Sequence, residues 1–394
     1  MTATDLPAPG TQMDAEAVGA LADRAAQVLD ALRAGLADDE ARSLEVRYGA
    51  KDASALLGVT PAGLYRAQDD GLVLSPAARS GYTLAELNEA RRALGVLPWR
   101  DEADEPVILA VQNFKGGVGK STVAVHLSQY LAQKGYRVLL VDADSQASAT
   151  AAFGYNPDAE VGENETLLPL LMDGAVRDLA YCVRATHWDG LDLVPANLDL
   201  YNAEYMLGHQ LAQDASAVNR LRAGLRATAA AYDVVVIDPP PALGMVSLSV
   251  VQAANAVLVP CPPLTLDFAS TATFLSMMAQ VMDTLARTGA EARYRFVRFI
   301  ATKTDPNKAA QAALREAMGE VFAGHVLDTP LLTSAEYDAA SLGMRSLYEV
   351  TEGRGRGYAR ARRNMDQVFG ELEAAIRGSW PSVRPGAGAL GEAA

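Results

Sequence analysis

Residues Val107–Thr122 of this chain of 394 residues read VILAVQNFKGGVGKST, and they carry the strongest fold signal in the sequence. The start of this stretch, VILAVQ, is typical of a buried strand, and a helical pattern follows from Lys120 to about Gln133. A strand, a glycine-rich loop and a helix in this order form a phosphate site, because the loop directs N–H groups at an anion near the positive end of the helix. We therefore expect a P-loop nucleotide-binding domain.

The residues of this loop have distinct expected roles at the phosphates. Gly116, Gly117 and Gly119 let the backbone curl around the β-phosphate. Lys120 is expected to reach the β- and γ-oxygens, and the Ser121 hydroxyl to ligate Mg²⁺. The nucleotide-binding residues predicted from the loop are Gly116, Gly117, Val118, Gly119, Lys120, Ser121 and Thr122. A simple glycine turn is the alternative, and the flanking strand and helix argue against it.

The loop departs from the general pattern GxxxxGK[ST] at its first position, which is Phe114 instead of glycine. In exchange the chain has a second lysine, Lys115, directly before the double glycine. A lysine there is useful only if its charge reaches phosphate. We expect it to point outward from its own loop, so that a second subunit would benefit from the charge.

Two later apolar runs end in carboxylates. RVLLVDAD ends with Asp142 and Asp144, and YDVVVID ends with Asp238. The carboxyl end of a parallel strand beside a P-loop is where a water-mediated contact to Mg²⁺ belongs. Aspartate commonly ends strands, so each segment alone is a weak signal. Together with the P-loop, they predict metal-site residues Ser121, Asp142 and Asp238.

The pattern from Val107 to about Gly378 is one of apolar strands alternating with amphipathic helices. It predicts an α/β fold with a parallel sheet covered by helices on both faces. The expected strands are Val107–Gln112, Arg137–Val141, Leu191–Val194, Asp233–Ile237, Ala256–Pro260 and Phe296–Thr302. The segment 379–394 is rich in proline, glycine and alanine, and we expect it to be a disordered tail.

An amphipathic helix is expected near the N-terminus, in Asp14–Leu36. Apolar residues recur there at three- and four-residue spacing: Val18, Leu21, Ala25, Val28, Leu32 and Leu36. Such a helix either packs on its own domain or forms a dimer seam, and the sequence does not decide between the two.

Residues 51–94 have the pattern of a helix-turn-helix. Asp52–Leu57 is a short helix, and Thr60 then caps a second helix that has Pro61 at its first position and stops at Gly71. The segment 72–82 is a candidate wing, and a capping box at 83–86 starts another helix. The predicted domains are 1–43, the winged helix-turn-helix at 44–100, an acidic linker at 101–106, the nucleotide domain at 107–378 and the tail.

Charge and composition limit the function classes. The net charge is −14, which disfavours a surface uniformly attractive to DNA, but residues 44–100 carry seven basic and six acidic residues. No apolar run approaches a membrane span and no signal peptide is seen, so we expect a cytoplasmic protein. Cys182 and Cys261 form no metal pattern.

The segments KGGVGKST, VLLVDADSQAS and YDVVVIDPPPALG together resemble the deviant Walker ATPases of the ParA/MinD type. The resemblance covers about residues 106–377. PPLTLDFASTATFL and the late SLYEV…YARARRNMDQVFGELE are most similar to plasmid-partition ATPases of the larger ParA/RepA group, which carry an N-terminal helix-turn-helix. Residues 51–94 also resemble MerR-type winged helices in the ending GY-T-L-x-E-L.

The resemblance implies an ATP-driven homodimer that binds ATP or ADP with Mg²⁺. Catalytic roles fall on Lys115, which would cross to the partner's nucleotide, on Lys120, and on Asp144, which would position water. Asp142 would order the magnesium shell and Asp238 would be the Walker B acid. Hydrolysis is expected to be slow alone and stimulated by DNA and a ParB-type centromere-binding partner, on the bacterial nucleoid. Lys303 and Asp305 lie where the base is usually recognised, although a solvated loop is an equal alternative.

Two groups of residues are candidates for DNA binding. In the helix-turn-helix they are Tyr65, Arg66, Gln68 and Arg79, which would read an operator. Near the C-terminus they are Arg354, Arg356, Arg360, Arg362 and Arg363, where glycines at 353, 355 and 357 indicate a flexible basic loop before a helix from Tyr358. The helix-turn-helix could instead be a structural or protein-contact module. The arginine cluster could instead be a solvated helix face.

The sequence leaves three functions other than DNA partition to consider. A MinD-like membrane-cycling ATPase would need a basic amphipathic C-terminal helix, but the last helix carries Asp366, Glu371 and Glu373. An iron–sulfur carrier would need paired cysteines, which the chain lacks. A chiefly transcriptional repressor modulated by ATP stays open.

Overall fold

The computed structural model describes residues 15–34, 43–287, 293–343, 345–351 and 354–383. The chain divides into two compact units, Met1–Ser43 and Leu44–Ala394. In the first, the predicted amphipathic helix is α1 (Ala15–Ala34). Its apolar side chains Val18, Leu21 and Val28 are about half exposed. Leu36 lies outside the described residues, and the role of α1 stays open.

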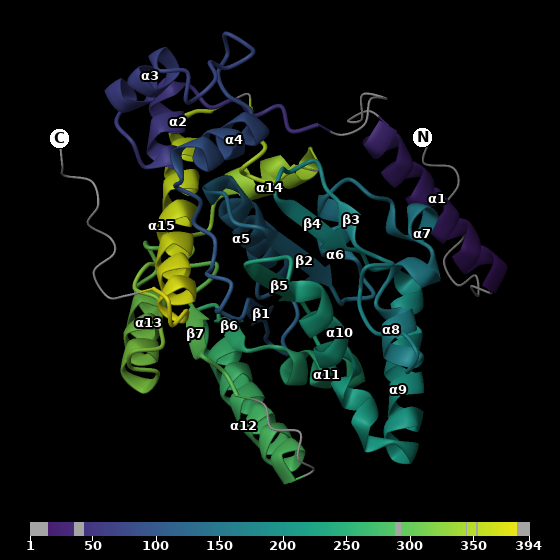
Figure 1. Cartoon of the computed structure of the whole chain (residues 1–394). Helices are drawn as coiled ribbons and strands as arrows, with labels where there is room; N and C mark the ends of the chain where they lie inside the picture. Colours follow the sequence, from purple (N-terminus) through teal and green to yellow (C-terminus); the bar gives the residue numbers. More distant parts are fainter. Residues whose placement is uncertain (1–14, 35–42, 288–292, 344, 352–353, 384–394) are drawn as a thin grey trace, which may run out of the picture. The chain divides into compact units, whose positions relative to one another are not determined.

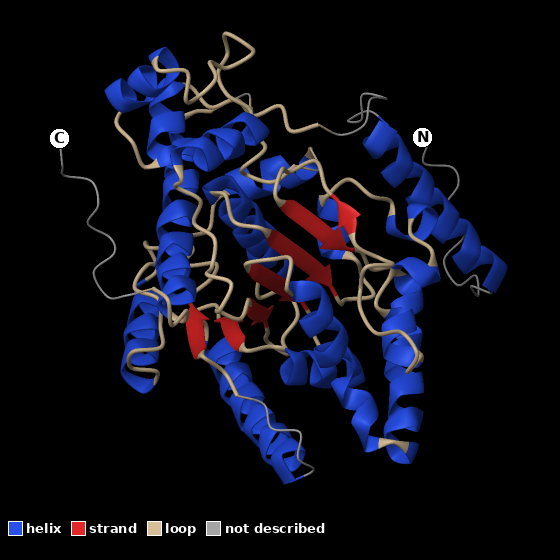
Figure 2. Cartoon of the chain, in the orientation of Figure 1, coloured by secondary structure: helices blue, strands red, loops and turns tan. Residues whose placement is uncertain are grey.

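The second unit is built on one sheet of seven strands among the described residues, in the order β3-β4-β2-β5-β1-β6-β7 (Figure 2). The strands are β1 (Val107–Val111), β2 (Val138–Asp142), β3 (Arg184–Ala185), β4 (Leu191–Val194), β5 (Val234–Asp238), β6 (Ala256–Pro260) and β7 (Phe296–Ile300). All neighbouring strands are parallel except β3, which runs antiparallel to β4. The six predicted strands are confirmed to within two residues at each end. The edge strand β3 was not predicted, because two residues carry no periodicity.

The helices of the nucleotide domain cover the sheet on both faces (Figure 1). Alternate residues of β1 separate into two cores: Leu109 packs with α5 and α15, and Ile108 packs with α10 and α11. The helices are α5 (Lys120–Lys134), α6 (Ser148–Ala152), α7 (Pro157–Glu160), η1 (Glu163–Glu165), α8 (Leu168–Met172), η2 (Leu198–Leu200), α9 (Tyr201–Gln213), η3 (Ala215–Asn219), α10 (Arg220–Ala229), α11 (Met245–Ala253), α12 (Thr265–Arg287), α13 (Ala309–Val321), α14 (Ala335–Leu342) and α15 (Arg356–Gly378). The predicted α/β fold is confirmed.

The helix-turn-helix contains α2 (Ala50–Leu57), α3 (Pro61–Asp69) and α4 (Leu84–Leu94). The predicted caps are present, since Thr60 accepts from the Gly63 N–H and Thr83 forms a capping box with Glu86. Residues 72–82 are described in full and contain no paired strands, only isolated bridges. The segment predicted as a wing is a loop closed by two isolated antiparallel bridges, Ala78 with Gly81 and Tyr48 with Tyr82.

The helix-turn-helix packs firmly against the C-terminal end of α5. Arg91 on α4 is 1% exposed, and its Nη2 donates to the Gln133 carbonyl at 2.6 Å and the Leu56 carbonyl at 3.3 Å. Burial lowers the pKa of Arg91 to about 10. The Gln133 amide also donates to the Tyr48 hydroxyl at 2.8 Å. Residues 44–100 thus share one compact unit with the nucleotide domain.

The predicted acidic linker and the predicted tail are both anchored in part. Asp104, in the predicted acidic linker, is 4% exposed and accepts a hydrogen bond from the Ser382 hydroxyl. Trp380 is 2% exposed and its ring lies 6.2 Å from that of Tyr136. The prediction of a disordered tail was therefore wrong for 379–383, because an apolar indole is buried there. Residues 384–394 lie outside the described part of the chain.

Candidate nucleotide-binding site

The glycine-rich loop connects β1 to α5, and two of its glycines are required by the backbone. Gly117 has φ 75° and Gly119 has φ 97°, a region that side chains disfavour. Gly116 has no such constraint. A Cβ added there would meet its nearest atom, the Cβ of Pro241, at 4.0 Å. Within this subunit the space above Gly116 is therefore open.

The residue that breaks the general P-loop pattern has a packing role. Phe114 lies edge-on to Phe274 of α12, with ring centroids 4.6 Å apart. The neighbouring Asn113 is fully buried, and its amide donates to the Pro260 carbonyl at 2.8 Å and the Thr271 hydroxyl at 3.1 Å. The loop is thus fastened to β6 and α12 on the side where glycine would leave a gap.

Lys115 makes an intramolecular ion pair. Its Nζ lies 2.9 Å from Oδ1 of Asp267 on α12, with the two side chains 35% and 11% exposed. The expectation that Lys115 points outward was wrong for the single subunit, because a nearly buried carboxylate on α12 attracts the charge. Sequence reasoning missed Asp267, although it lies in the quoted segment PPLTLDFAS; periodicity alone gives no sign of its partner.

Lys120 is nearly buried at the start of α5, with 7% of its surface exposed. Burial lowers its pKa, while the charges of Asp238 and Asp144 oppose that shift. Its Nζ is 3.4 Å from the Lys115 carbonyl, which is a weak contact. The ammonium group therefore lies at the start of α5, near enough to Asp238 and Asp144 for their charges to act on it.

Asp142 and Asp238 stand side by side on β2 and β5, and both are fully buried. Burial raises the pKa of Asp142 to about 7, against hydrogen bonds from Thr150. Burial also raises the pKa of Asp238 strongly, and the charge of Asp142 adds to this. Two adjacent carboxylates at low dielectric repel each other, so the pair is stable as anions only beside a cation.

The residues present fit a magnesium ion. Neither carboxylate oxygen of Asp238 accepts a well-formed hydrogen bond from the residues that the structure describes, while the Ser121 hydroxyl is close enough to lower its pKa. Asp142, in contrast, accepts from the Thr150 N–H at 2.8 Å and its hydroxyl at 2.7 Å. A buried, unsatisfied carboxylate beside a hydroxyl is the donor set that Mg²⁺ uses next to a P-loop.

Asp144 lies at the open side of this pair, with 8% of its surface exposed. Its N–H donates to Asp142 Oδ1 at 3.2 Å, and its Oδ1 accepts from the Gln146 N–H at 3.0 Å. One oxygen of Asp144 is thus used to shape the turn after β2. The other belongs to the same acidic group as Asp142 and Asp238, whose pKa it also raises.

The segment 302–305 lies against the P-loop, since the Thr302 hydroxyl donates to the Val118 carbonyl at 2.8 Å. Lys303 has φ 51° and an exposed side chain. Asp305 is engaged locally: its Oδ1 accepts from the Asn307 N–H at 3.0 Å. Asp305 and Arg360 also line one pocket of about 280 Å³. The position of the segment fits a nucleotide, and its role in base binding stays a prediction.

The predicted operator-reading residues differ in their exposure. On α3, Tyr65 is 55% exposed and Arg66 is exposed. Gln68 is only half-exposed, and its amide donates to the Tyr82 hydroxyl. Arg79 is exposed in the loop after α3.

Of the C-terminal arginines, Arg354 precedes α15 and the other four lie on it, because α15 begins at Arg356, two residues before the expected start. Its 23 residues carry a helical apolar face that extends through Tyr358 into the first turn. The prediction that Arg362 contacts DNA was wrong, because its side chain is engaged within the protein. Its guanidinium lies 4.0 Å from the centroid of the Tyr348 ring and donates to Gln133 Oε1 at 2.7 Å. The arginines left exposed are Arg354, Arg356, Arg360 and Arg363.

The parallel sheet, the strand–loop–helix at Lys120 and the carboxylates that end β2 and β5 define a P-loop nucleotide-binding protein. Comparisons with known proteins narrow this class. Residues 107–288 match the family described as AAA domain. The chain is 33% identical to a putative replication protein A of Rhizobium rhizogenes over 84% of this chain and 87% of that protein. It is 31% identical to protein SopA of Escherichia coli K12 over 79% of this chain and 82% of SopA.

The chain belongs to the ParA-type family of plasmid-partition ATPases. A solved structure described as a partition protein covers 92% of this chain and 98% of its own, with a TM-score of 0.66 and 21% identity, which supports the fold. Among the described residues, no helix is both long and apolar enough to cross a membrane.

Proposed function

We propose that this chain hydrolyses ATP with Mg²⁺ to drive DNA partition. The observation that carries the proposal is the buried pair Asp142 and Asp238 beside Lys120, in which neither carboxylate oxygen of Asp238 accepts a well-formed hydrogen bond from a described residue. Ser121 and Asp238 would hold Mg²⁺, and Asp142 would order its water shell. The ion would neutralise charge on the phosphates.

The residues of the chain would divide the remaining work. The N–H groups from Gly116 to Ser121 would bind the phosphate oxygens, and Lys120 would place its charge on the β- and γ-phosphates. Asp144, at the open side of the acidic group, would orient the attacking water. Lys303 and Asp305 would border the base.

Full activity would require a second copy of the chain. ATP would join two subunits face to face, and each Lys115 would leave Asp267 to contact the partner's nucleotide. The open space above Gly116 suits the close approach of a second loop. The ion pair with Asp267 would then hold the isolated subunit in a low-activity state and make its turnover slow before dimerisation.

DNA binding would occur in two modes. Tyr65, Arg66 and Arg79 would read an operator for autorepression. Exposed arginines at the start of α15 would contact phosphates of any sequence. The clamp of Arg91 on Gln133 links the helix-turn-helix to α5, the helix that begins at Lys120. Through it the nucleotide state would influence operator binding. A ParB-type protein would stimulate hydrolysis on the nucleoid.

The test of hydrolysis uses Lys120→Ala, Asp144→Ala and, as a control, the exposed Asp283→Ala. We expect Lys120→Ala to lose both ATP binding and phosphate release. Asp144→Ala should bind a fluorescent ATP analogue but release phosphate at least tenfold more slowly, because only the water is misplaced. Normal turnover by Asp144→Ala would remove it from the catalytic role.

A further inference from the structure

A second pocket lies at the edge of the sheet where the parallel strands begin. It has a volume of about 520 Å³, and Pro106 before β1, Asn255 before β6 and Arg295 before β7 line it. The P-loop follows the other end of β1, a five-residue strand that spans roughly 16 Å. The pocket is therefore separate from the nucleotide site.

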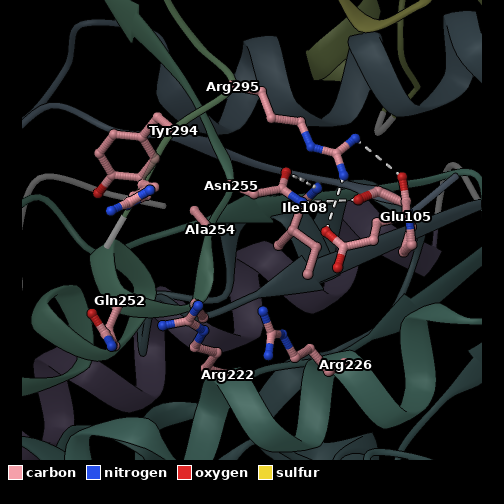
Figure 3. Close-up of a pocket in the computed structure, with 12 residues that line it drawn as sticks. Glu105, Ile108, Arg222, Arg226, Gln252, Ala254, Asn255, Tyr294 and Arg295 are labelled. Atoms are coloured by element: carbon pink, nitrogen blue, oxygen red, sulfur yellow. Dashed lines mark hydrogen bonds and ion pairs between the residues drawn. The ribbon is translucent and has the colours of Figure 1, made fainter. Parts of the chain in front are cut away.

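Positive charge converges on this pocket from two sides (Figure 3). Its four arginines are Arg222, Arg226, Arg293 and Arg295. The first two lie one turn apart on α10, and the last two flank Tyr294 just before β7. The one carboxylate of the lining, Glu105, is already paired with Arg295, at 3.1 Å. In a chain with a net charge of −14, such a concentration of guanidinium groups indicates an anion.

The base of the pocket is fixed by the backbone contacts of Asn255. Its Oδ1 accepts from the Ile108 N–H at 2.8 Å, and its Nδ2 donates to the Pro106 carbonyl at 2.9 Å. Arg295, with a side chain 20% exposed, also donates to the Glu105 carbonyl at 3.1 Å. A ligand would therefore meet a wall whose groups are already oriented, at little entropic cost.

The side chains of Arg226 and Gln252 indicate which chemical groups a ligand of the pocket would carry. Arg226 is exposed, and it makes no hydrogen bond or ion pair with any residue in the described ranges. Gln252 is 1% exposed; its amide donates to Asn219, but no described residue donates to its side-chain oxygen. The pocket thus offers Arg226 as a charged fork for phosphate oxygens, and Gln252 is a buried polar residue of its lining.

We propose that this pocket binds a compact polyphosphate, either inorganic or carried by a nucleotide. Guanidinium groups on opposing walls match an anion with several oxygens, and the exposed Arg226 can bond such an anion in bidentate fashion. The volume is in the range of small-ligand sites. Duplex DNA fits less well, because its backbone is a convex surface and these arginines line a concavity. The proposal does not depend on the proposed ATPase function.

Isothermal titration with tripolyphosphate tests the proposal. The full-length Lys120→Ala protein, in magnesium-free buffer, removes the P-loop as a competing site. We expect one saturable site, weakened at least tenfold in Arg222→Gln/Arg226→Gln. The single change Arg226→Gln, at an exposed position that folding does not need, should weaken it about threefold or more. Arg315→Gln, an exposed arginine on α13, is the control and should leave the affinity unchanged.

A parallel titration with ADP distinguishes an inorganic polyphosphate from one carried by a nucleotide. Tighter binding of ADP than of tripolyphosphate assigns the pocket to a nucleotide, and the reverse order assigns it to an inorganic polyphosphate. Absence of saturable binding to either, or equal affinity in the arginine variants, would overturn the proposal. So would a loss of duplex DNA binding in those variants with no change for tripolyphosphate. Normal ATP hydrolysis with an intact P-loop would leave the proposed function standing in each case.

Discussion

Replacing Asp267 by asparagine should favour the ATP-dependent dimer. The substitution keeps the shape of the side chain and removes the charge that holds Lys115 at 2.9 Å. In the proposed dimer Lys115 must leave this ion pair, so the pair stabilises the separate subunits. Without it, less free energy is spent on releasing the lysine.

The size of the effect follows from the exposure of the pair. The side chains of Lys115 and Asp267 are 35% and 11% exposed, between a surface pair and a buried one. We assign each pair about 1 kcal/mol, the upper end for exposed pairs. A dimer breaks two pairs, so the gain is about 2 kcal/mol, or roughly 30-fold in the dissociation constant.

Sedimentation velocity with a slowly hydrolysed ATP analogue measures this constant. The control is Asp283→Asn, the same change on the same helix, in an ion pair with Arg287 whose side chains are 61% and 77% exposed. The control should leave the dimer constant unchanged. An unchanged or weaker dimer in Asp267→Asn would refute the reasoning, since Asp267 would then support the lysine in both states.

Three further predictions concern the loop, pH and DNA. Gly116→Val should keep nucleotide binding yet abolish the ATP-dependent increase in sedimentation, because the side chain has room in one subunit but not between two; a surviving increase would exclude the face-to-face dimer. Burial lowers the pKa of His126, whose neutral ring bonds the Thr122 carbonyl and the Leu347 N–H. The contribution of this residue to stability is therefore complete above the unfolded pKa of about 6.5 and decreases as the pH falls below it. At pH 5.5 the loss in the free energy of unfolding should be at most about 1.4 kcal/mol. Thermal unfolding of wild type and His126→Gln at pH 7.5 and 5.5 measures this loss of stability. An equal loss in the two proteins would show that another group causes the pH dependence. Arg66→Ala should reduce discrimination between operator and random duplexes by about 1–3 kcal/mol in competition binding, with affinity for random DNA unchanged. Equal losses of affinity for operator and random DNA would show that operator reading and phosphate binding are not separate modes.

Much of the fold was predictable because the signals are local. The β1–loop–α5 unit, the strands ending at Asp142 and Asp238, and the caps at Thr60 and Thr83 each depend on residues within a few positions. Helix periodicity, glycine conformation and capping operate over that range. The same signals failed for β3, which is too short to show a pattern.

The phosphate-binding loop and the acidic residues at neighbouring strand ends can be read from local sequence, since parallel strands bring their carboxyl ends to one edge. The partners of the charged side chains depend on the packing of the folded chain. Lys115 is held by Asp267 of α12, and Arg362 contacts Gln133, 229 positions away in the chain. The basic pocket likewise joins α10 to the start of β7. Such pairings depend on how helices pack over the sheet, and no spacing along the chain encodes them.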